Sequence, residues 1–136
     1  MMHILLITLT AAITMLALDF MWIATVAHPA YVAALTNQLR SFEHAEPMVW
    51  ISVIMVYILM VSSFMVFIVP RLKHLSLIGS CVYAGFLGLV IYGVFAMTNF
   101  AILKHWTIPL LALDTCWGAI LFGCTALVVK LIFKSL

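Results

Sequence analysis

The chain has 136 residues, of which 68% are apolar and only 7% are charged. Soluble domains of this size are nearer half apolar and a quarter charged, so this composition excludes a soluble globular protein and predicts an integral membrane protein. The net charge of +2 indicates no particular partner beyond membrane lipids, and we expect no contact with nucleic acid.

The first apolar run covers residues 4–27 and contains one charged residue, Asp19. It lacks a basic n-region and is too long for the h-region of a signal peptide, so we expect it to be retained as the first transmembrane helix. Pro29 can occupy the first turn of a following helix. Residues 29–42 then place apolar side chains at spacings of four, four and three, which predicts a short amphipathic helix on the outer membrane surface (Tyr31, Leu35, Leu39 and Phe42).

The second and third apolar runs, residues 48–69 and 75–97, contain no charge and are joined by a tight turn, so they should be antiparallel neighbours. The third run carries small residues at every fourth position (Ser76, Ser80, Ala84 and Gly88). Small residues at this spacing let helix backbones approach closely in lipid. The stripe indicates either tight packing within the bundle or the interface of a homodimer.

The fourth run covers residues 106–129 and contains Asp114 as its one charge. The four runs together predict an all-α integral membrane protein, with four transmembrane helices in one antiparallel bundle and an interfacial helix after the first. The whole chain, residues 1–136, should form this single domain. The three cysteines have no CxxC spacing, so we expect no disulfide framework, metal site or cofactor.

The basic residues predict the orientation of the bundle. Four of them fall on the side that carries both termini (Arg71, Lys73, Lys130 and Lys134), and two fall on the other side (Arg40 and Lys104). The positive-inside rule therefore places both termini in the cytoplasm.

Two aspartates inside the apolar runs are the most informative feature of the chain. Residues 15–22 and 110–117 share the pattern apolar-Leu-Ala-Leu-Asp-x-x-Trp, which contains Asp19 and Asp114. Ionisable groups within a membrane are rare and usually mark a functional site. Both aspartates lie eight residues, or about 12 Å of helix, below the outer boundary, so they could face each other and share one proton.

Other polar and aromatic side chains are expected at the same end of the bundle, where they would form an outward-facing polar pocket. We therefore consider seven candidate residues for binding a substrate or proton (Asp19, Asp114, Tyr92, Asn99, Trp22, Trp117 and His28). The alternative for the aspartates is a structural role, in which each is protonated and holds helices together through hydrogen bonds. Trp50, Trp106 and Trp22 could equally form an outer aromatic belt, whereas Trp117 lies too deep for a belt and could be a simple packing residue.

Several segments resemble a family of small four-helix bacterial inner-membrane proteins whose function is unknown. The similar segments are Tyr92-Gly93, Thr98-Asn99, Leu103-Lys104 with Trp106, and Asp114 with Trp117-Gly118. The resemblance implies a location in the bacterial inner membrane. The chain departs from the family pattern at Phe95 and Ala96, where Tyr-Asp is usual, and Trp106 and Pro109 are not adjacent.

Three kinds of function fit these observations. The sequence favours binding or transport of a proton, a cation or a small molecule at the aspartate pair. A membrane-embedded lipid-modifying enzyme, or an accessory subunit of one, is the first alternative, with the carboxyl groups as acid and base. A structural or assembly protein is the second. We favour a protein that is not an enzyme, because no complete catalytic constellation is visible.

Overall fold

The computed structural model describes residues 1–35, 38–40 and 42–133, and its elements are all helical. The first helix comprises α1 (Met2–Trp22), the π-helical η1 (Ile23–Ala27) and α2 (His28–Leu35). The second comprises α3 (Pro47–Ser63), the π-helical η2 (Phe64–Ile68) and α4 (Val69–Leu72). The last two helices are α5 (Leu77–Ile102) and α6 (Ile108–Ile132). All four are long and apolar enough to span a membrane, as the sequence predicts.

The sequence predicted a separate helix over residues 29–42, and the structure does not contain one. Residues 28–35 continue the first helix, which runs without a break from Met2 to Leu35. The first part of the predicted apolar face packs within the protein, since Leu35 is buried against Trp106 and Leu110, whereas Leu39 and Phe42 lie beyond the helix and are exposed. Residues 36, 37 and 41 of the predicted helix lie outside the described residues.

Each π-helical segment ends just before an intrahelical proline. Pro29 follows η1, and Pro70 follows η2, by two residues. A proline ring clashes with the carbonyl four residues earlier and donates no backbone hydrogen bond. At η1 the N–H of His28 bonds the carbonyl of Ile23, five residues back, and Val69 bonds Phe64 in the same way at η2. These wider turns accommodate the prolines without ending either helix.

The hairpin of α5 and α6 is the most closely packed pair of helices. A Cβ atom added at Gly88 would lie 2.0 Å from the Gly118 carbonyl oxygen, and one at Gly118 would lie 2.4 Å from the Gly88 oxygen. Ser80 and Ala84 are fully buried on the same stripe. Three members of the small-residue stripe therefore pack against α6 within one chain, whereas Ser76 is exposed. A homodimer through this helix stays a prediction.

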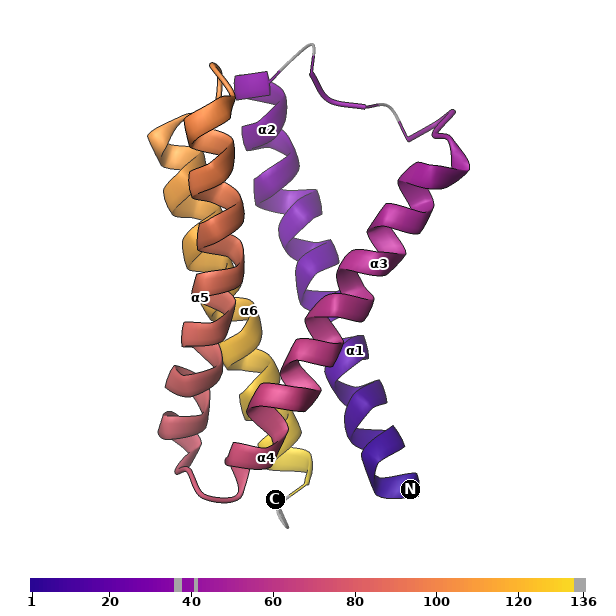
Figure 1. Ribbon diagram of the computed structural model, residues 1–136, viewed down its shortest axis with the longest axis vertical. Helices are drawn as coiled ribbons and strands as arrows, with labels where there is room; N and C mark the ends of the chain where they lie inside the picture. Colours follow the sequence, from indigo (N-terminus) through magenta and orange to yellow (C-terminus); the bar gives the residue numbers. More distant parts are fainter. Residues whose placement is uncertain (36–37, 41, 134–136) are drawn as a thin grey trace.

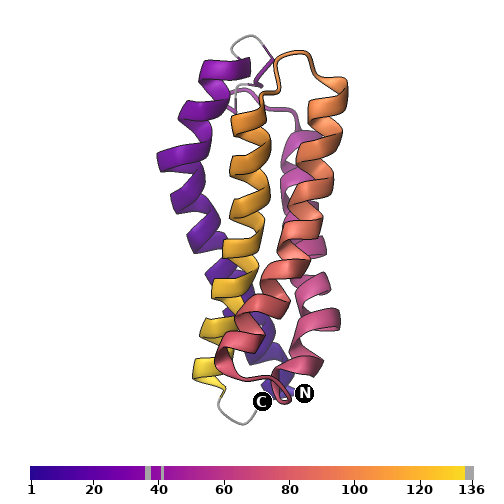
Figure 2. The same ribbon diagram turned by 90° about the vertical axis from the view of Figure 1, so that its left-hand side faces the viewer.

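The remaining helices pack on this hairpin unequally. α1 packs on α6, and the buried core lies mainly where α1, α3 and η2 meet the hairpin. Figure 1 shows that the start of α3 diverges from the other helices, whereas its η2 end lies against them. Figure 2 shows α5 and α6 side by side, with both termini at the same end of the bundle.

Side chains close the helix ends near the membrane boundaries. The Ser76 hydroxyl accepts a hydrogen bond from the Gly79 N–H at 3.0 Å, and Thr107 accepts one from Leu110 at 3.4 Å. At the end that carries the termini, the ammonium of Lys130 donates to the Leu72 carbonyl at 2.5 Å and also to the Leu75 carbonyl. Lys130 thus attaches the end of α6 to the turn between α4 and α5.

Candidate carboxylate site

Asp19 lies on the buried stripe of α1. Ile7, Ala11 and Met15 precede it at intervals of four residues, and all three are buried in the core. This spacing keeps successive side chains on one face of a helix, so Asp19 also points inward and is 8% exposed. Its two carboxylate oxygens accept hydrogen bonds from the Tyr57 hydroxyl at 2.7 Å and the Trp117 indole N–H at 2.8 Å.

Asp114 has a different donor. It is 4% exposed, and the Tyr31 hydroxyl lies 2.7 Å from each of its two oxygens. The π-helical turn explains how Tyr31 reaches this position. Twelve residues of regular α-helix would turn Tyr31 about 120° from Asp19. The extra residue accommodated in η1 reduces this to about 20°, so both side chains face α6.

Asp19 and Asp114 lie on α1 and α6, which pack against each other, and we call these two residues the carboxylate centre. No hydrogen bond joins the two carboxylates among the described residues, since each has its own tyrosine. Beside Asp19, which accepts the Trp117 N–H, the rings of Trp22 and Trp117 stack with centroids 4.3 Å apart and planes within 2°. The repeated Asp-x-x-Trp pattern therefore brings both tryptophans into one contact.

The other predicted site residues lie at varying distances from this centre. The Tyr92 hydroxyl is half-buried and lies 3.8 Å from the Met60 sulfur. Asn99 is half-buried, with no side-chain hydrogen bond within the part of the chain that the structure describes. His28 is exposed on α2 and is not brought to the carboxylates. The described residues also include no group of three or more His, Cys, Asp or Glu side chains able to hold a metal.

Neither carboxylate has a basic partner among the residues that the structure describes. Within residues 1–35, 38–40 and 42–133, neither Asp19 nor Asp114 forms an ion pair, and every side-chain partner given above is a hydroxyl or an indole N–H. Lys130, the basic side chain that reaches into the protein, bonds carbonyls at the far end of α6. The described residues therefore supply no counter-charge for either carboxyl group if it is ionised.

Sequence reasoning overlooked the two tyrosines that bond the carboxylates. Tyr57 could be placed at the right depth from its position in the second apolar run, but nothing in the periodicity showed which way it points. Tyr31 was assigned to the membrane surface, because Pro29 was taken as the start of a new helix. A helix that continued through Pro29 with one wide turn would have directed Tyr31 toward α6.

The outer end of the site contains a second aromatic cluster. Trp106 is 6% exposed, so it is not part of an outer aromatic belt. Its ring lies 5.6 Å from that of Tyr31 and 5.8 Å from that of Phe95. Its indole N–H is buried and has no hydrogen-bond partner among the described residues. The cluster packs directly behind the tyrosine that bonds Asp114.

Four apolar helices around a buried pair of carboxyl groups define a polytopic membrane protein with an intramembrane acidic centre. The family described as "Predicted membrane protein (DUF2177)" matches residues 4–131. The chain therefore belongs to this family, whose function is unknown. No curated protein and no solved structure matches the chain.

Proposed function

We propose that the chain binds a proton or a cation at the Asp19–Asp114 centre and carries it within the membrane. The observation that supports this proposal is the absence of a basic partner for either carboxylate among the described residues. Withdrawing a carboxylate from water costs several kcal/mol, and an ion pair normally offsets that cost. Here the compensating positive charge has to come from outside the protein, as a proton or as a bound cation.

The hydrogen-bond donors around the carboxylates suit such exchange. Tyr57, Trp117 and Tyr31 are neutral, so they orient the carboxylate oxygens without neutralising them. Each Asp is thus held in place whether its charge is balanced by a proton or by a cation. A cation bound at one carboxylate favours release of a proton from a neighbouring carboxyl group, because the positive charge stabilises the ionised form.

Two grooves beside α3 lead toward this centre. A groove of about 620 Å³ between α1 and α3 is lined in part by Tyr57, the donor to Asp19. A second groove, of about 380 Å³, lies between α3 and α5 and is lined in part by Tyr92. Both are almost wholly apolar, and we propose that movement of α3, rather than a fixed aqueous pore, gives access to the carboxylates.

Catalysis fits the site less well than binding. Acid–base chemistry on a lipid requires a positioned nucleophile or activated water within reach of the acid. The described side chains bonded to Asp19 and Asp114 are aromatic donors, and Cys116, close to Asp114 in sequence, is exposed on another face of α6. A purely structural role, in which each aspartate is protonated and bonded to a tyrosine hydroxyl, is the second candidate, and the flux assay described below separates it from ion binding.

Proteoliposomes containing a pH-sensitive dye test the proposal. Under an imposed gradient of Na⁺, K⁺ or an organic ammonium ion, the parent protein should change the internal pH faster than empty liposomes. Asp19→Asn and Asp114→Asn should each reduce the flux at least tenfold. Thr125→Val, which removes a buried hydroxyl bonded to the Leu121 carbonyl elsewhere on α6, is the control and should leave the flux unchanged. Equal fluxes for the parent and the double Asp variant would contradict the proposal, as would no flux from the parent.

We also propose the orientation suggested by the basic residues. Figure 1 shows both chain ends at the end of the bundle where α4 lies. Arg71 is in the last turn of α4, Lys73 follows that helix directly, and Lys130 is in the last turn of α6. This end should face the cytoplasm of a bacterial cell, with the protein in the inner membrane. A fluorescent reporter fused to the C-terminus should fold and emit there, whereas alkaline phosphatase fused at the same place should be inactive. The opposite pattern would reverse the orientation.

A further inference from the structure

One face of α3 is not covered by the rest of the chain. Seven residues from the start of α3 and the segment before it line a pocket of about 420 Å³. Val56 also lines the groove of about 380 Å³ between α3 and α5, so the two hollows meet at this residue. The residues of α3 that line the two hollows follow helical spacing down one side of the helix, and the last of them, Met60, is buried (Val49, Ser52, Val53, Val56, Leu59 and Met60). Each volume lies within the range of about 300–1,000 Å³ that is usual for ligand sites.

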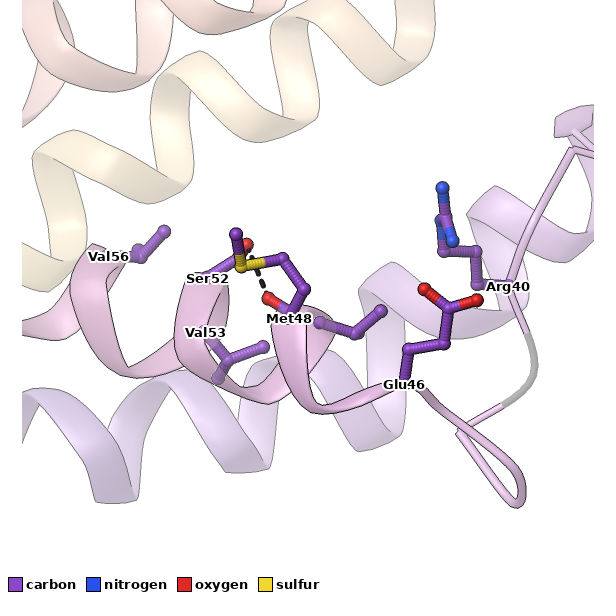
Figure 3. Close-up of a pocket in the computed structure, with 7 residues that line it drawn as sticks. Arg40, Glu46, Met48, Ser52, Val53 and Val56 are labelled. Carbon is purple, nitrogen blue, oxygen red and sulfur yellow. Dashed lines mark hydrogen bonds between the residues drawn. The ribbon is translucent and has the colours of Figure 1, made fainter.

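The two ends of this stripe differ in chemistry. Arg40 and Glu46 line the pocket at the start of α3. Figure 3 shows their side chains at one end of this pocket, past Met48 and Ser52. Neither charge forms an ion pair within the described part of the chain. The α3–α5 groove, by contrast, is lined by apolar side chains and Tyr92, and Phe95 closes its far wall. The site therefore has one cation and one anion at its head and hydrocarbon along its length.

The length of the stripe matches one leaflet of a membrane. From Glu46 to Met60, α3 rises about 21 Å at 1.5 Å per residue. Half of a bilayer, with its headgroup region included, is about 20–22 Å thick. A molecule that fills the stripe thus has a charged head at the membrane surface and an apolar chain that ends near the midplane. Those are the dimensions of a phospholipid.

We propose that this face of α3 binds a phospholipid with a phosphoethanolamine headgroup. Arg40 contacts the phosphate, and the carboxylate of Glu46 accepts hydrogen bonds from the primary ammonium. One acyl chain follows Val56 and Leu59 into the groove between α3 and α5. Such a headgroup complements both charges of the pocket. A phosphoglycerol headgroup offers no cation to Glu46, and a phosphocholine headgroup has no N–H to donate to it.

Native mass spectrometry of the purified full chain in detergent tests this assignment. Phosphatidylethanolamine, phosphatidylcholine and phosphatidylglycerol with identical acyl chains are titrated separately. The parent should retain phosphatidylethanolamine about tenfold more tightly than the other two, as expected for charge-assisted hydrogen bonds. Glu46→Gln should reduce this preference to less than about twofold, and Arg40→Gln should weaken all three lipids, since each carries a phosphate. Leu59→Trp, which fills the groove, should weaken all three without changing their order.

Two matched variants control for loss of charge and for added bulk. Lys104→Gln removes a basic side chain outside the pocket, and Val94→Trp adds an indole on the exposed face of α5. Both should bind like the parent. Equal retention of the three lipids by the parent, or an unchanged preference in Glu46→Gln, would overturn the proposal. Asp19→Asn and Asp114→Asn should keep the lipid preference. The lipid measurement therefore tests this proposal independently of cation binding.

Discussion

The contact between Gly88 and Gly118 allows a quantitative prediction. A Cβ added at Gly88 would lie 2.0 Å from the Gly118 carbonyl oxygen and 2.9 Å from the Cβ of Phe122. An ordinary carbon–oxygen contact is about 3.3–3.6 Å, so α5 and α6 would have to separate by about 1.3 Å or more. Backbone atoms cannot rotate away as a side chain can, and the whole crossing must therefore shift.

Gly88→Ala should consequently destabilise the protein. Overpacking of this kind costs about 1–3 kcal/mol, more than the about 0.5–1 kcal/mol that Ala gains over Gly in a helix. Gly93→Ala is the matched control on the same helix, because its Cβ would meet the Thr115 methyl carbon at 3.4 Å, an ordinary contact. It should be neutral or slightly stabilising.

Reversible unfolding in mixed micelles, followed by circular dichroism as the fraction of sodium dodecyl sulfate is raised, measures both variants. The midpoint should move to lower detergent fraction for Gly88→Ala and stay level or rise for Gly93→Ala. If the two variants unfold at the same fraction, the close approach of the two backbones does not stabilise the hairpin and the reasoning is refuted.

Three further substitutions test the hydrogen bonds of the bundle. Trp117→Phe keeps the aromatic ring but removes the N–H that bonds Asp19, and it should lower the free energy of unfolding in the same micelle assay by about 1–3 kcal/mol. Tyr31→Phe removes the donor to Asp114 and should cost a similar amount; an unchanged midpoint would mean that this hydrogen bond is not formed in the membrane. Lys130→Met removes the hydrogen bonds to two carbonyl groups at the turn between α4 and α5, so limited proteolysis should cut that turn several-fold faster. An unchanged rate would mean that Lys130 does not hold the end of α6 to this turn.

The four helices could be predicted from the sequence because the length of an apolar run alone shows whether a helix can span a membrane. Four runs of apolar residues had to become four helices, since backbone polar groups in lipid must be satisfied within each segment. The same logic located the Asp pair, because a carboxyl group between apolar neighbours is costly unless it faces the protein. Asp19 and Asp114 are both buried, at 8% and 4% exposure.

The contacts between helices were harder to predict from the sequence, because they depend on which faces of the helices meet. Periodicity treated Pro29 as a boundary, although η1 lets the helix continue and turns Tyr31 toward Asp114. The small-residue stripe allowed either an internal or an external contact, and the internal contact became visible only with the position of Gly118 on α6. A single sequence does not state which glycine of one helix meets which glycine of another.

The wide turn at Phe64–Ile68 has a consequence for how Asp19 could change its surroundings. The hairpin of α5 and α6 is locked by backbone contact, so it cannot open without loss of that contact. Tyr57 is the one donor to Asp19 that α3 carries, whereas Trp117 belongs to the locked hairpin. A pivot of α3 about its π-helical end would withdraw the phenol from Asp19 while the indole stayed in place. The carboxylate would then pass between a doubly bonded, closed state and a singly bonded state open to an incoming ion.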